Sequence, residues 1–156
     1  GRGRDWQSGI SAIVVILIVV AVMAAAAGVG IPLFLSQKKT NLKSSVQSDV
    51  RSVTAVMESA LSKVDQDQSK LVFKGGTNCT NSGTTRNCTF SKSAPGSING
   101  LIVNLTTDNT VTVIVQLKLD VYQVEGGNSG LTAGGEQAQW IYFSQTGTSK
   151  WDPSEP

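Results

Sequence analysis

The longest apolar run of this chain lies near its start, from Ile10 to Leu35. Nearly all residues of the run are Ile, Val, Leu, Ala, Met or Gly, and no residue from Gly9 to Gln37 carries a charge. A helix needs about 20 apolar residues to cross a bilayer, whereas the apolar part of a secretory signal has only about 7–15. The run therefore predicts a membrane-spanning helix. A buried core helix is the alternative, and it fits less well because the run is apolar on every side.

The location of the remaining chain is indicated by its composition rather than by the charges that flank the run. Basic residues stand on both sides of the run and fix no orientation: Arg2 and Arg4 before it, and Lys38, Lys39 and Lys43 after it. The chain beyond Lys43 is rich in Ser, Thr, Asn and Gly, which favours an outside location. Its two cysteines, Cys79 and Cys88, predict a disulfide in an oxidising compartment, with two free thiols as the alternative.

A second helical pattern follows the apolar run. Apolar residues recur at spacings of three and four, which is one face of a helix: Leu42, Val46, Val50, Val53, Met57, Leu61 and Val64. No glycine stands between Pro32 and Gly75, so we expect one long helix from about Ile10 to Asp65, bent at Gly28–Pro32 where proline removes a helix hydrogen bond. Its second half has a single apolar stripe and should pack on one partner surface.

The partner surface is predicted to be a small antiparallel sheet. Strands are expected at Leu71–Phe73, Leu101–Leu105, Val111–Val121 and Trp140–Phe143. The second and third of these should pair as an antiparallel hairpin. Turn residues predict loops at 75–100 and at Gly126–Gly135, and an irregular tail from Lys150 to Pro156. The expected fold class is α+β, with a long N-terminal helix packed on the sheet. The expected division is 1–9 as a polar segment, 10–35 as the spanning or filament-core helix, and 36–156 as the half-helix and sheet head.

The chemistry of the chain argues against an enzyme. Histidine is absent, so triads and general bases that use it are excluded, and no GxGxxG or Gly-rich GK[ST] loop occurs. Without histidine or closely spaced cysteines no zinc site is expected, and Asp65 and Asp67 lack the glycine and glutamate of a calcium loop. No cofactor or metal is therefore expected. The small positive net charge is not clustered, so no nucleic acid partner is indicated.

Three Asn-X-Thr tripeptides begin at Asn78, Asn87 and Asn104. Such tripeptides are acceptors for N-linked glycans. A chain this rich in Ser and Thr contains nearly as many by chance, so the sequence alone leaves their modification open.

Several segments, taken in order, resemble the type IV pilins, especially those of Gram-positive bacteria. GIPLFLSQKK (Gly30–Lys39) is similar to the segment that follows the family's apolar helix, and SSVQSDVRSVTAVMESAL (Ser44–Leu61) to the next helix. YQVEGGNSG and WIYFSQTG resemble the last strands and turns. The resemblance implies a structural subunit of a surface filament, held in the membrane before assembly, with the sheet domain outward for adhesion or motility.

The family's leader peptide ends in Gly, is cut by a prepilin peptidase that methylates the new terminus, and is followed by an acidic residue at the fifth mature position. Two registers fit this chain. Cleavage between Gly9 and Ile10 starts the mature chain at the apolar run, but Val14 then stands at the acidic position. With Gly1 as the mature terminus, Asp5 is the acidic residue, at the cost of a polar extension. An uncut cytoplasmic flank is the third alternative.

The resemblance also implies residues and partners for assembly. Asp5 would pair with the terminal amine of a neighbouring copy, because a buried carboxylate is tolerated only when it is paired. Gly28 and Gly30 would permit close approach of helices, and Gly28–Pro32 would lose regular helix on assembly. The expected partners are further copies in a helical filament, the peptidase and the pilus assembly machinery.

Two other functions remain open. The chain is also consistent with a minor pilin or a pseudopilin of a secretion or DNA-uptake machine. It is further consistent with an unprocessed single-span membrane protein that carries a small extracellular binding domain.

Overall fold

The computed structural model describes residues 31–153 and 155–156, with side chains from residue 37 onward. The chain divides into two compact units, Gly1–Thr40 and Asn41–Pro156. The described part of the first unit is the start of helix α2, which runs from Ile31 to Lys63. Residues 10–30 of the predicted span, and residues 28–30 of the predicted bend, lie outside the described residues. Among the described helices, none is both long and apolar enough to cross a membrane.

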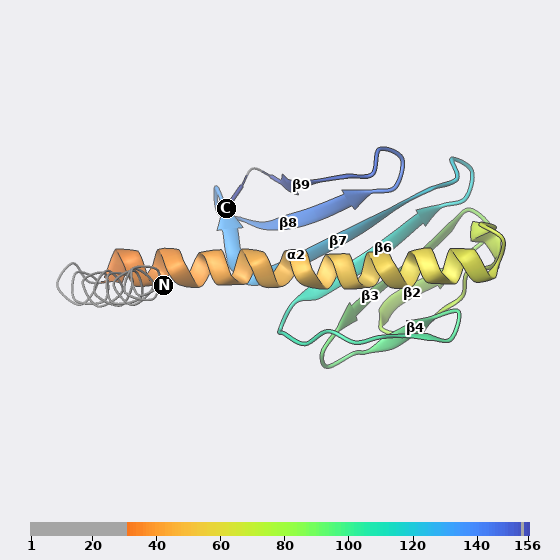
Figure 1. Cartoon of the computed structure of the whole chain (residues 1–156), viewed down its shortest axis with the longest axis horizontal. Helices are drawn as coiled ribbons and strands as arrows, with labels where there is room; N and C mark the ends of the chain where they lie inside the picture. Colours follow the sequence, from red (N-terminus) through yellow and green to blue (C-terminus); the bar gives the residue numbers. More distant parts are fainter. Residues whose placement is uncertain (1–30, 154) are drawn as a thin grey trace, which may run out of the picture. The chain divides into compact units, whose positions relative to one another are not determined.

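The second unit has the predicted α+β architecture, in which α2 packs against antiparallel sheets (Figure 1). One sheet has three strands in the order β1-β4-β5: β1 (Phe73–Gly75), β4 (Gly96–Ile98) and β5 (Leu101–Val103). The other has six strands in the order β2-β3-β6-β7-β8-β9: β2 (Thr77–Asn81), β3 (Thr85–Ser91), β6 (Thr110–Gln116), β7 (Val121–Ala133), β8 (Glu136–Phe143) and β9 (Thr148–Asp152).

The apolar stripe of α2 lies against the inner face of the six-stranded sheet, as predicted. Five members of the stripe are buried with the alternate valines of β6 in one core: Val46, Val50, Val53, Met57 and Leu61, with Val111, Val113 and Val115. Gly126 of β7 permits the close approach of the helix, because a Cβ atom there would meet the side chain of Val50 and would lie 3.2 Å from that of Val46. The period of the stripe therefore identified the correct face of the helix.

The end of α2 lies two residues before the predicted end. Asp65 and Gln66 adopt left-handed backbone conformations, with φ of 53° and 64°, and the Gln66 amide donates to the Leu61 carbonyl. A short 3₁₀ helix, η1 (Gln68–Lys70), follows. The Asp67 carboxylate caps η1 by accepting from the Ser69 amide. It also accepts from the Ser69 hydroxyl, and these two bonds, the hydroxyl first, lower the pKa of Asp67. Asp67 is thus the N-cap of this short helix.

The predicted hairpin between 101–105 and 111–121 is wrong. β5 pairs with β4 in the smaller sheet, whereas β6 pairs with β3 and β7. The predicted long strand 111–121 is also broken, because Asp120 has a φ of 54° and the chain turns there to form the β6–β7 hairpin. Alternation of apolar residues continues through this turn, so the sequence pattern did not reveal the break.

Three segments predicted as irregular contain strands. The predicted loop at 75–100 contains all of β2, β3 and β4. In β3, Cys88 and Phe90 point into the core between polar residues. Most of Gly126–Gly135 lies in β7, and only Gly134 and Gly135, with φ of 61° and 84°, make the turn into β8. In the predicted irregular tail, residues 150–152 belong to β9.

Candidate functional site

The predicted disulfide between Cys79 and Cys88 is present and joins β2 to β3. The Cα atoms are 4.0 Å apart, Cys88 is buried in the core, and Cys79 is partly exposed. The bridge lies where the β2–β3 register shifts, between the pairs Thr77–Thr89 and Thr80–Asn87. It therefore holds an edge strand at a point where regular backbone pairing is interrupted. Such a bond is typical of extracytoplasmic compartments.

Replacing both Cys79 and Cys88 with serine is expected to lower the free energy of unfolding by about 2–3 kcal/mol, because the bridge restricts a short loop in the unfolded chain. Chemical denaturation of the full chain in a mild detergent measures the change. Reduction of the wild-type chain should give the same loss. Equal denaturation midpoints for the oxidised, reduced and variant chains would contradict the prediction.

A buried polar network fixes the segment between β5 and β6 to α2. Asp49 is only 5% exposed, and its carboxylate accepts from Thr107 Oγ1 at 2.7 Å and from Asn109 Nδ2 at 2.8 Å. Asn109 Nδ2 also donates to Ser45 Oγ at 3.0 Å, and Asn128 Nδ2 donates to Asn109 Oδ1 at 2.9 Å. A buried carboxylate must be satisfied by donors, and here neutral side chains supply them. The network therefore positions residues 107–109 relative to the helix.

The helical pattern of the sequence did not reveal this network. Asp49 follows Val46 by three positions and directly precedes Val50, so it borders the apolar stripe. Its place at the border of the stripe was the one sequence feature that indicated a buried carboxylate. The partners lie about 60 residues away in the chain, at Thr107 and Asn109, and no local pattern indicates them.

Replacing Asp49 with alanine is expected to lower the free energy of unfolding by about 1–3 kcal/mol, because the Thr107 hydroxyl and the Asn109 amide lose a buried acceptor. Asp49→Asn keeps one acceptor oxygen and should lose less. Denaturant titrations of both variants test this order. A loss from Asp49→Asn as large as that from Asp49→Ala would mean that the acceptor oxygen does not carry the effect.

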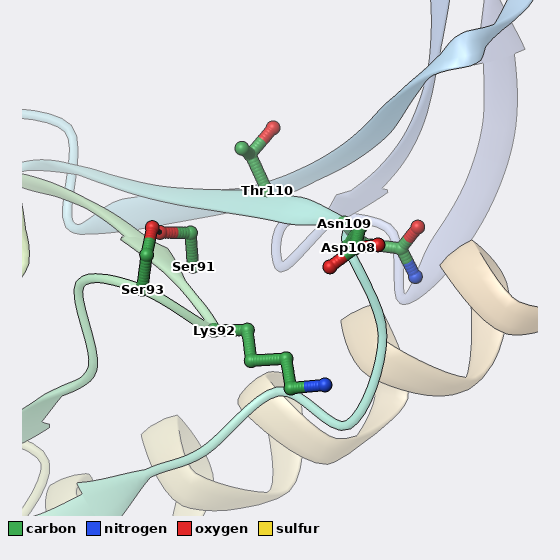
Figure 2. A pocket seen from close by; sticks show the side chains of 6 residues that line it. All are labelled: Ser91, Lys92, Ser93, Asp108, Asn109 and Thr110. Atoms are coloured by element: carbon green, nitrogen blue, oxygen red, sulfur yellow. Dashed lines mark hydrogen bonds between the residues drawn. The ribbon is translucent and has the colours of Figure 1, made fainter.

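A polar hollow of about 400 Å³ lies beside this network, at the β3–β4 connection and the start of β6 (Figure 2). Its lining side chains are Ser91, Lys92, Ser93, Asp108, Asn109 and Thr110. Figure 2 shows the Ser91 and Ser93 hydroxyls together on one side, and Asp108 with Asn109 on the other. The two hydroxyl oxygens lie 3.1 Å apart. The hollow offers hydroxyl, amine and carboxylate groups to water or a small polar molecule. The described residues contain no cluster of His, Cys, Asp or Glu that could hold a metal ion.

Two shallow grooves follow α2 on either side. One, of about 260 Å³, is lined by residues that include Arg51, Trp140 and Tyr142. The centroid of the Trp140 ring lies 5.3 Å from that of the Trp151 ring. The other, of about 250 Å³, is aliphatic and includes Val56, Leu101 and Ile102. Ile102 is 68% exposed. Both faces beside the helix thus present apolar side chains to the solvent.

The C-terminal tail is joined to the helix by an ion pair. Lys43 Nζ lies 2.6 Å from Glu155 Oε1, and this hydrogen bond and charge hold the pKa of Glu155 below its ordinary value. Both groups have access to solvent, so the pair contributes little to stability. It does bring the last residues of the chain next to the start of the second unit's helix.

A second hollow, with acidic lining residues, lies on the β7–β8–β9 face, where Glu125, Glu136 and Asp152 stand together with glutamines. Burial raises the pKa of Glu125, and the charge of Asp152 raises it further. The folded state therefore holds the Glu125 proton more tightly than the unfolded chain does.

Glu125→Gln is expected to stabilise the fold at neutral pH and to have no such effect in acid. For the wild type, stability should fall as pH rises from the unfolded pKa of 4.5 through the raised folded pKa. Denaturation midpoints of both chains over this pH range test the sign. Parallel pH profiles would show that Glu125 is not the group responsible.

The residues expected to act in processing and assembly are mostly outside the described part of the chain. Gly1, Asp5, Gly9 and Ile10 belong to this group, as do Gly28 and Gly30. Pro32 is the second residue of α2.

No family model, curated protein or solved structure matches this chain. The architecture is pilin-like, with an N-terminal helix packed on an antiparallel sheet and a disulfide at the sheet edge.

Proposed function

We propose that this chain is the structural subunit of a type IV pilus-like surface filament. The observation that carries the proposal is the packing of α2, whose stripe from Val46 to Leu61 is buried in the core that the helix shares with the sheets. This amphipathic helix follows directly, in the sequence, on the apolar run Ile10–Leu35. A head built on the second half of such a helix leaves the preceding apolar half to pack with other copies.

The proposed assembly exchanges lipid contacts for helix contacts. The subunit waits in the membrane, held by Ile10–Leu35, after a prepilin peptidase has processed it. The assembly machinery then lifts it out, and the apolar helices of many copies bundle into the filament core. Small residues such as Gly28 and Gly30 permit close helix packing. The apolar surface stays out of water throughout, and the sheet domain faces outward for adhesion or motility. The proposed role uses no catalytic group and no cofactor.

The test is to shear producing cells, collect filaments, and measure the intact mass and N-terminal sequence of this chain. Filaments rich in the chain, with a methylated terminus at Gly1 or Ile10, would support the proposal and determine the cleavage register. An unprocessed chain found only in membranes would contradict it and indicate a single-span surface protein. Low abundance together with a transport defect on deletion would indicate a minor pilin or a pseudopilin.

A further inference from the structure

The three Asn-X-Thr tripeptides occupy different environments in the fold. Two are Asn-Cys-Thr, beginning at Asn78 and Asn87, and the third is Asn-Leu-Thr, beginning at Asn104. This tripeptide accepts N-linked oligosaccharide on exported proteins and belongs on a surface loop. The disulfide indicates that the head is exported. An acceptor must present both its amide and its hydroxyl to a transferase, so exposure, strand pairing and backbone conformation discriminate among the three.

Asn87 is a poor acceptor because it lies in the middle of β3. It pairs with Thr80 of β2 on one side and with Ile114 of β6 on the other. Its Oδ1 atom is buried without a hydrogen-bond partner, and the next residue, Cys88, is buried and bonded to Cys79. A transferase would have to separate three strands to reach this amide.

Asn78 is exposed but has the wrong backbone conformation. It lies in the edge strand β2 with a φ of 55°, in the left-handed region. The tripeptide is therefore bent at its acceptor residue, and the middle residue, Cys79, is held to β3 by the disulfide. Neither feature allows the segment to extend into a transferase site.

Asn104 has every feature that the other two lack. It follows the end of β5 at Val103 and precedes β6, so no strand pairing holds it. Val103 and Leu105 are buried, whereas Asn104 and Thr106 are exposed, so both the amide and the hydroxyl of this tripeptide are accessible to solvent. In the described structure neither the Asn104 nor the Thr106 side chain makes a hydrogen bond within the protein, and Asn104 has no positive φ.

We infer that Asn104 is a site of N-linked glycosylation. The donor is an oligosaccharide carried on a polyprenyl phosphate or pyrophosphate at the outer face of the membrane. Asn104 Nδ2 forms a bond to the anomeric carbon, the bond from that carbon to the phosphate oxygen breaks, and the lipid phosphate leaves with the electron pair. The amide loses one proton, and nothing is oxidised or reduced. The glycan would stand close to Ile102, which is 68% exposed two residues earlier.

The test is intact mass and peptide mapping of the full chain purified from the cells that make it. The expected result is a glycan mass on the peptide that contains Asn104 and none on the peptides that contain Asn78 and Asn87. Asn104→Gln and Thr106→Ala should each abolish that mass. Thr106→Ser, which keeps the hydroxyl, and Asn78→Gln, which alters an exposed sequon elsewhere, should retain it.

Two results would overturn the inference. The first is an unmodified Asn104 peptide in the wild-type chain. The second is a glycan mass that persists on the chain when Asn104 is replaced with glutamine. Neither depends on filament formation, since export to the transferase is sufficient, so failure of this inference and failure of the filament proposal are separate outcomes.

Discussion

Replacing Phe90 with alanine is expected to lower the free energy of unfolding by about 3–5 kcal/mol. Phe90 is fully buried, and its ring meets that of Phe73 edge-to-face, with centroids 6.5 Å apart and an interplanar angle of 74°. These rings lie in β3 of the larger sheet and β1 of the smaller one, so the cavity would open where the two sheets meet. Denaturant unfolding of the full chain in a mild detergent measures the loss.

Leu119→Ala is the matched control for this experiment. Leu119 is 67% exposed at the turn between β6 and β7, and its truncation should change stability by no more than about 0.5 kcal/mol. If Phe90→Ala unfolds at the same denaturant concentration as Leu119→Ala, the junction of the two sheets does not contribute to the stability of the head.

Replacing Gly126 with valine is expected to cost about 3 kcal/mol, because overpacking of a close helix–sheet contact forces side chains off their rotamers or moves the helix. The new side chain would overlap that of Val50 and crowd that of Val46, both on α2. Hydrogen exchange should show weaker protection of the α2 amides, in addition to the lower denaturation midpoint.

Gly83→Val controls for the change of glycine to a β-branched residue. An added Cβ at Gly83 meets nothing within 4 Å, and its backbone has no positive φ. The stability of this variant should stay close to that of the wild type. A comparable loss from both glycine variants would show that backbone preference, rather than the contact with α2, explains the effect.

The sequence predicted those elements whose apolar residues recur regularly along one face over many positions. The stripe on α2 repeats over several helical turns, and the valines of β6 keep a period of two although Ile114 interrupts the alternation, so both faces of the core could be recognised. The disulfide could be predicted because Cys79 and Cys88 are the only cysteines. These features follow from local periodicity and composition.

The remaining parts depend on contacts that no local pattern reveals. β3 has polar residues on its solvent face and few apolar ones inward, so it resembles a loop until its pairing with β6 is known. The pair Gly126-Gly127 is typical of a loop, but both glycines lie within β7. At Gly126 the helix approaches the sheet too closely for a side chain. The Asp49 network joins residues about 60 positions apart. Strand order and buried polar pairs are tertiary properties of this kind.

The edge strands of the six-stranded sheet affect whether neighbouring copies of this protein can pair through their backbones when they are crowded. An open strand edge is a template for pairing with another chain. Here β2 has an interrupted register, and β9 carries Lys150 and Asp152 and is followed by Pro153, which has no amide hydrogen to donate. Crowded heads would therefore meet through side chains and not merge their sheets by backbone pairing. These two edges are therefore poor templates for the strand pairing that builds amyloid-like aggregates.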